Sequence, residues 1–312
     1  MPGTFLIGTP SARDPRGGNW NPLQEQAEAI GAALPPLVVA AERLASAVSL
    51  GVHGRRKSGM GETFWQFRRY APEDPSSAID WRQSGKSQHL FVREREWEAA
   101  EAVWFWRDGS PAMRFKSSYS DVTKLERATL LALALASLLV RGGERIAVLG
   151  DGHGPATGRV PLRRMAHELV EAQPGDEALP PEAPVTRNAQ FVWLSDFLSP
   201  IGRIESAMQR LSASGLNGHL VHVIDPAEED FPFAGRTRFE SMRGDENELL
   251  GRAETVRSAY RSRFRAHAEA IRALARRSRW SYLAHRTDKR PEMALIALYA
   301  DIGGELARAR PA

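Results

Sequence analysis

Four short apolar stretches, each running into an aspartate, constrain the fold of this chain more than any other feature. Helical patterns lie between them, and such runs are typical of buried strands in a parallel sheet. Parallel strands end at one edge of their sheet, where open α/β sheets bind ligands. We therefore expect four carboxylates along this edge, which we call the carboxyl rim. The stretches 103–107, 146–150, 191–195 and 221–224 lead into Asp108, Asp151, Asp196 and Asp225.

From residue 101 onward, strands and helices alternate regularly, which predicts a parallel sheet with helices on both faces. The expected fold class is therefore α/β, with a doubly wound, mostly parallel sheet. Strands are predicted at 101–107, 145–150, 190–195, 219–224 and 280–284, with a short edge strand at 157–160. Helices are predicted at 121–140, 162–172, 200–213, 254–277 and 291–306.

Two smaller parts precede this α/β domain. Residues 1–52 form an N-terminal extension with a predicted helix at 37–50, opened by prolines. Residues 53–100 combine glycines, turn residues and short β-like pieces around 79–81 and 89–93, which predicts a small β-rich module. The expected domains are therefore 1–52, 53–100 and 101–312.

Composition limits the cellular location of the protein and the kinds of site that it can contain. The 312 residues include no cysteine, so disulfides, thiolate zinc sites and cysteine nucleophiles are excluded. The longest apolar run, 130–140, is too short to cross a bilayer core of about 30 Å. Residues 1–20 lack the pattern of a secretory signal. We expect a cytoplasmic protein without a membrane span.

Positive charge is concentrated near the C-terminus. Nine arginines lie between 252 and 279, where only Glu254 and Glu269 oppose them, in a chain of net charge +4. A solvated amphipathic helix accounts for this pattern, and nucleic-acid binding is the alternative. The segment lacks an aromatic stacking pattern, so a nucleic-acid partner is not favoured.

The loop after the first strand is the candidate metal site. Asp108 and Ser110 supply a carboxylate and a hydroxyl, and Asp196 could join them from a neighbouring strand end. Hard cations such as Mg²⁺ bind such oxygen ligands. Ala112 stands where a second hydroxyl would complete the set. The alternative is that Asp108 and Asp196 only cap helices or turns.

Other motifs indicate no particular chemistry. Gly85, Lys86 and Ser87 resemble the end of a phosphate-binding loop, but the required first glycine is replaced by Asp80. His219 and His222 lie on opposite faces of a predicted strand, which favours structural roles. The chain has no Gly-x-Ser-x-Gly nucleophile pattern.

The block Ile79-Asp80-Trp81-Arg82 carries a resemblance to a known family. Together with 59–64, 67–74, 90–94 and the strand into Asp108, it resembles the bacterial domain-of-unknown-function family 58, over roughly residues 50–300. Taken by itself, the block alternates in polarity like a half-buried strand, with Asp80 and Arg82 on one face.

The resemblance implies a von Willebrand factor A-like domain with a metal-ion-dependent adhesion site at the carboxyl rim. Residue by residue, Asp108 and Ser110 match the first two ligands and Asp196 matches the late acid, for Mg²⁺ or Mn²⁺. Ala112 departs from the expected serine, and Thr157 and Thr186 remain alternatives for a threonine ligand. The resemblance also implies a MoxR-type AAA+ ATPase as partner.

These observations lead to one expectation of function and two alternatives. We expect a non-enzymatic protein-interaction and assembly factor that uses the rim, acting with a MoxR-type ATPase on a client protein. A metal-dependent phosphoester hydrolase at the same rim is the first alternative. A nucleic-acid binder that uses the arginine-rich helix is the second.

Overall fold

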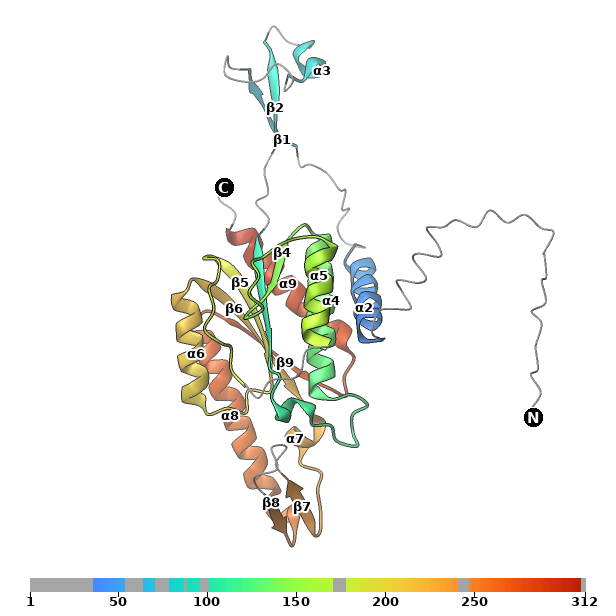
Figure 1. Cartoon of the computed structure of the whole chain (residues 1–312), viewed down its shortest axis with the longest axis vertical. Helices are drawn as coiled ribbons and strands as arrows, with labels where there is room; N and C mark the ends of the chain where they lie inside the picture. The colour runs from blue at the N-terminus through green and yellow to red at the C-terminus, as the bar shows by residue number, and fades with distance from the viewer. Residues whose placement is uncertain are drawn as a thin grey trace, which may run out of the picture.

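The computed structural model describes residues 36–53, 64–70, 79–86, 89–95, 101–170, 178–240 and 247–309. Its centre is a five-stranded sheet in the order β4-β3-β5-β6-β9, in which every pairing is parallel (Figure 1). This arrangement confirms the predicted α/β fold class. The strands are β3 (Ala102–Arg107), β4 (Arg145–Val148), β5 (Ala189–Ser195), β6 (Leu216–Ile224) and β9 (Ser281–Arg286).

Helices cover both faces of this sheet, and each face has its own apolar core. One core packs the sheet against the first group of helices, and the second core packs it against the other group. The first group is α2 (Pro36–His53), α4 (Lys124–Arg141), α5 (Arg159–Val170) and α9 (Pro291–Ala309). The second group is α6 (Ile201–Ala213) and α8 (Arg257–Arg277).

Helix α4 is buried along most of its length, which explains its long apolar run. Its first turn is fixed by a capping box, in which Thr123 and Glu126 each accept from the other's backbone N–H. One side of α4 packs on the sheet and α2 covers another, so apolar residues are needed nearly all round. A 2.6 Å ion pair between Glu42 and Arg141 joins the two helices at the surface.

The order of the strands fixes where a ligand would bind. The chain passes from β3 to β4 on one side, and then returns to β5 on the other side of β3. In open α/β sheets, the crevice at such a reversal is the usual ligand site. Here the reversal lies between the carboxyl ends of β3 and β5, which lead into Asp108 and Asp196.

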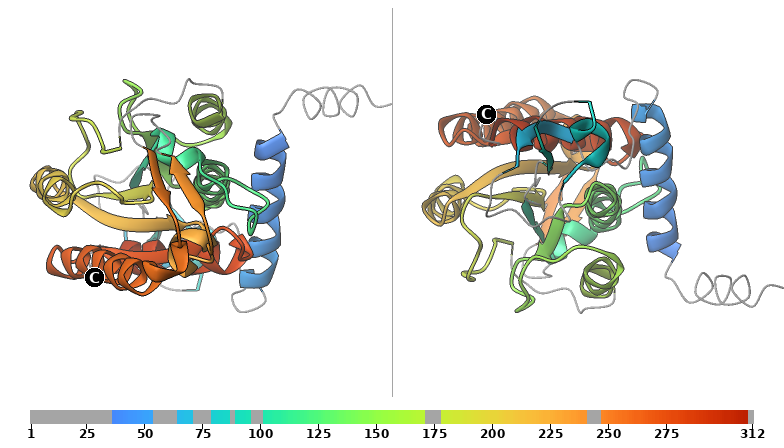
Figure 2. Two further views of the ribbon diagram at one scale, coloured as in Figure 1. Left: turned by 90° about the horizontal axis from the view of Figure 1, so that it is seen from below. Right: turned by 90° about the horizontal axis from the view of Figure 1, so that it is seen from above.

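A small excursion projects beyond the carboxyl rim. After β6 the chain forms the short helix α7 (Pro226–Asp230) and then the antiparallel pair β7 (Thr237–Glu240) and β8 (Asn247–Leu250). Seen from below, the two orange strands lie in front of the sheet (Figure 2, left). No strand was predicted from the sequence between residues 225 and 253.

Two local predictions were wrong. No strand forms at 157–160, because only Ala156 bridges to Ile146 and α5 already begins at Arg159.

Asp80, the second case, does not lie in a strand either. Its side chain accepts from the N–H of Gln83 at 3.0 Å and caps the short helix α3 (Trp81–Ser84). That helix accompanies an antiparallel pair, β1 (Phe64–Arg69) and β2 (Phe91–Arg95).

None of the described helices combines the length and the apolar composition needed to cross a bilayer.

Gly218 in β6 gives a test of the second core. A methyl group on Gly218 would lie 1.9 Å from Cε3 of the buried Trp280 ring. We expect Gly218→Ala to lower the free energy of unfolding by about 1–3 kcal/mol through overpacking. Gly202→Ala on α6, where nothing lies within 4 Å, should leave stability unchanged or slightly higher. Equal changes in the free energy of unfolding for the two variants, measured by chemical denaturation, would contradict this packing.

His219 gives a test of the polar contacts inside the sheet. It is bonded to Ser281 Oγ and Gln190 Oε1, and burial lowers its pKa to about 4. The unfolded chain therefore binds an extra proton between about pH 6.5 and 4. As pH falls through this range, the free energy of unfolding of wild type should decrease by on the order of 1 kcal/mol per pH unit relative to that of His219→Gln. Parallel stability curves for the two proteins would contradict this assignment.

Candidate functional site

Asp108 lies at the carboxyl end of β3 and is fully buried. One carboxylate oxygen accepts from the Ser110 backbone N–H at 2.8 Å, and the other accepts from Ser195 Oγ at 2.7 Å. Burial raises the pKa of Asp108, and the neighbouring Asp196 carboxylate raises it further. Ser110 is buried beside it, at the start of a 3-10 turn (Pro111–Arg114) that contains Ala112.

Asp196 lies at the end of β5, next to β3 in the sheet. Its Oδ1 accepts from the Leu198 N–H at 3.1 Å, and its Oδ2 accepts from Lys124 Nζ at 2.8 Å. The following residue, Phe197, has a φ of 49° and a buried side chain. This left-handed backbone is unusual for a bulky residue and marks a tightly determined turn.

Lys124 is the cation of the rim, and its side chain is completely buried. Its Nζ also donates to Glu228 Oε1 at 2.5 Å and lies 5.9 Å from the centre of the Phe115 ring. Burial lowers the pKa of Lys124, but the carboxylates of Asp196 and Glu228 outweigh burial, so the pKa lies above its usual value. The lysine is therefore held as an ammonium ion.

Helix α7 brings Glu228 to this ammonium. Asp225, at the end of β6, accepts from the Ala227 N–H at 2.8 Å, and Glu228 Oε2 accepts from the Asp225 N–H at 3.0 Å. This capping box fixes the direction of the Glu228 side chain. The other oxygen of Asp225 accepts from the Ser117 N–H at 2.9 Å, which ties the loop after β3 to the end of β6.

The predicted strand-end acids are brought together only in part. Asp108, Ser110 and Asp196 share the rim, and Asp225 joins them through α7. Asp151 lies apart after the edge strand β4, where it is 3.5 Å from Arg164 and accepts from the His153 N–H. The hydrogen bonds described for Asp108 and Asp196 involve neither Thr157 nor Thr186.

Among the side chains of Asp108, Ser110 and Asp196, only Ser110 Oγ lacks a hydrogen-bond partner, so the set fits a divalent cation poorly. Ala112 offers no hydroxyl, and both oxygens of Asp196 already accept hydrogen bonds, one of them from an ammonium. A divalent ion needs several free oxygen ligands and is repelled by a cation beside it. In the described part of the chain, no group of three or more histidine and acidic side chains is arranged to hold a metal.

Sequence reasoning missed Lys124 and Glu228, although both left a signal. A lysine in the first turn of a helix opposes the helix dipole, so it calls for a nearby acid. Asp225-Pro-Ala-Glu228 has the spacing of a capping box. The pairing of Lys124 with Glu228 spans 104 positions, and no local pattern reveals a contact over that distance.

A pocket of about 520 Å³ opens beside this cluster. Its polar lining includes Lys124, Glu228 and Arg238. Its apolar lining includes aromatic rings from the segment after α7 (Phe231 and Phe233), from β7 (Phe239) and from α8 (Tyr260). These rings pack on each other, with centroids 4.6 Å apart for Phe231 and Tyr260 and 5.2 Å for Phe233 and Phe239. A concave apolar site with a few convergent polar groups is typical of a binding site.

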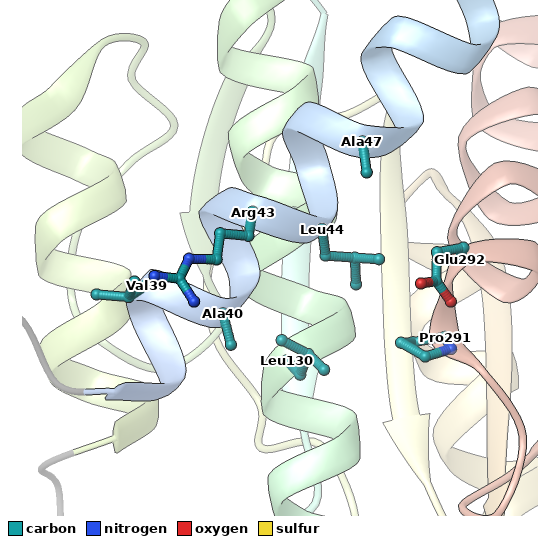
Figure 3. A pocket seen from close by; sticks show the side chains of 8 residues that line it. All are labelled: Val39, Ala40, Arg43, Leu44, Ala47, Leu130, Pro291 and Glu292. Atoms are coloured by element: carbon teal, nitrogen blue, oxygen red, sulfur yellow. The ribbon is translucent and has the colours of Figure 1, made fainter.

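A second hollow, of about 650 Å³, lies between α2, α4 and the start of α9. In Figure 3, Leu44 of α2 and Leu130 of α4 lie between the helices, with Arg43 and Glu292 beside them. It lacks a buried charge cluster like that around Lys124, so the pocket at the carboxyl rim is the stronger candidate.

Solved structures with some likeness to this chain come from Bacteroides species. They include the conserved hypothetical protein BatB from Bacteroides thetaiotaomicron, with a TM-score of 0.43 and 14% identity over 67% of this chain and all of that one. An aerotolerance-related membrane protein from Bacteroides fragilis gives a TM-score of 0.39 and 16% identity, with the same coverage of both chains.

Sequence comparison assigns the chain to a family. Uncharacterized proteins Rv1480 of Mycobacterium tuberculosis and Mb1516 of Mycobacterium bovis are each 27% identical over 222 residues, which is 66% of this chain and 68% of theirs. The model of the family described as "Protein of unknown function DUF58" matches residues 66–270, well over half of the chain. The chain therefore belongs to the DUF58 family.

Proposed function

We propose that this chain is a non-enzymatic, cytoplasmic protein-interaction factor that docks a partner protein in the pocket at the carboxyl rim. The partner is a MoxR-type AAA+ ATPase, as the family resemblance implies, and a client protein completes the assembly. The observation that carries the proposal is the pocket itself, where aromatic rings adjoin a buried charge cluster at the topological switch point.

Exposed apolar side chains around the pocket support docking of a protein. Leu198 and Tyr119 line the pocket and are 48% and 57% exposed. Large apolar and aromatic side chains that rim a concave site commonly provide most of the binding energy in protein interfaces.

The charges near the pocket favour a partner that presents basic groups. Asp196 and Glu228 share one ammonium, that of Lys124, and the buried carboxylates of Asp108 and Asp225 follow neighbouring strands of the same rim. Close to them, Arg286 is paired with three acids at about 3 Å, namely Glu229, Asp230 and Asp288. An excess of acids attracts a complementary basic surface and speeds its association.

A metal-dependent hydrolase gains less support from this geometry. Its carboxylates would have to bind a metal or activate water, but those of Asp108 and Asp196 are buried and accept hydrogen bonds from serine, lysine and backbone donors. The discriminating assay is phosphoester turnover that is lost in Asp108→Ala.

Four arginines of α8 make contacts within the protein. Arg272 and Arg276 pair with Glu269, and Arg277 pairs with Glu205. Arg257 donates to the carbonyl oxygens of Phe231 and Phe233, and so stabilises the aromatic cluster. These contacts support a structural role for the helix. Binding to nucleic acid would instead weaken steeply as salt rises.

Leu198→Asp tests the docking surface. The substitution places a charge in the exposed apolar margin of the pocket, and the side chain is exposed enough for the fold to tolerate it. We expect the affinity for a purified MoxR-type ATPase from the same organism to fall at least tenfold, which is about 1.4 kcal/mol. Biolayer interferometry with the full-length chain measures this change.

Val160→Asp is the matched control, because Val160 is 75% exposed on α5 and does not line the pocket. It should bind the ATPase as wild type does. If wild type does not bind the ATPase, the proposed partner is wrong. If both variants bind like wild type, the partner docks elsewhere on the chain.

A further inference from the structure

The carboxyl rim gathers acidic side chains that cannot remain buried without a cation. Asp108 and Asp196 follow adjacent strands, and Glu228 of α7 shares the Lys124 ammonium with Asp196. Burial raises the pKa of both Asp108 and Glu228, which shows how unfavourable their charges are. A cluster of this kind needs a positive charge and hydrogen-bond donors at its centre.

Lys124 provides both and is firmly positioned to do so. It is the first residue of α4, whose start is fixed by the Thr123–Glu126 capping box. Its backbone N–H donates to the Phe115 carbonyl at 3.3 Å, so the loop after β3 also holds it in place. Its Nζ then donates to Asp196 at 2.8 Å and to Glu228 at 2.5 Å.

The contacts of this ammonium resemble those of a bound metal ion. It binds carboxylates from two separate elements, β5 and α7, and it is shielded from solvent. The position that lacks a hydroxyl, Ala112, lines the same pocket as Lys124. The missing oxygen ligand and the added internal cation therefore occur together at one site.

We propose that the Lys124 ammonium is a built-in substitute for a divalent cation, so that the carboxyl rim is assembled and remains folded without bound metal. The substitution also makes the rim a latent metal site. Removal of the lysine side chain would leave the oxygens of Asp196 and Glu228 around an empty volume that Mn²⁺ or Mg²⁺ can enter. The inference goes beyond the proposed function and does not depend on any partner.

Calorimetric titration of the full-length wild-type protein with Mg²⁺ and with Mn²⁺ is the first test. We expect no saturable binding up to millimolar metal, and an unfolding temperature that neither metal nor EDTA changes. Saturable binding to wild type that is lost in Asp108→Ala would overturn the proposal. This measurement needs no variant that is at risk of misfolding.

Lys124→Ala is the second test. Removing one member of a buried ion-paired cluster should lower the unfolding temperature by roughly 10 °C. Millimolar Mn²⁺ should then recover several degrees in Lys124→Ala, while shifting wild type by less than about one degree. Lys116→Ala, which removes an exposed lysine from the preceding loop, should behave as wild type does.

Each outcome for a folded Lys124→Ala variant is decisive. A Lys124→Ala protein as stable as wild type would overturn the proposal, because the rim would then need no cation. A destabilised but folded variant that gains nothing from Mn²⁺ would also overturn it, because the ammonium would not occupy a metal position. If the variant does not fold, the wild-type titration decides. Neither test uses the ATPase, so failure here is distinguishable from failure of the docking proposal.

Discussion

One buried ammonium group joins the parts of this protein that meet at the end of its sheet. Lys124 begins α4, Asp196 follows β5 and Glu228 belongs to α7, and the three side chains are linked within 2.8 Å. A buried charge is unfavourable unless it is paired, so removing any one of the three side chains would leave an uncompensated buried charge on the others. The path of the chain at the carboxyl rim therefore depends on this one set of contacts.

The strand order explains why these contacts lie beside the proposed docking site. Reversal of the chain at β3 opens a crevice between β3 and β5, and α7 with the β7-β8 pair builds an aromatic wall beside it. The rim is thus rigid at its base, where charges are paired, and apolar at its margin, where Leu198 and Tyr119 are exposed. This combination suits a docking surface better than a reaction centre.

The sequence predicted the main fold because the strands are buried on both faces and read as continuous apolar runs. It also predicted that Asp108, Ser110 and Asp196 would lie close together, because parallel strands end at the same edge of their sheet. It failed at 157–160, where α5 already begins at Arg159, and at Asp80, which caps a short helix. Lys124 and Glu228 were missed because their contact depends on tertiary packing, which no local spacing reveals.

The most direct test of this account is a crystal structure of the wild-type protein grown in millimolar Mn²⁺, with anomalous scattering data recorded for manganese. If the Lys124 ammonium takes the place of a metal ion, the rim shows no anomalous peak, and continuous density for Lys124 reaches Asp196 and Glu228. An anomalous peak between Asp108, Ser110 and Asp196, with the lysine side chain displaced, would contradict this role of Lys124.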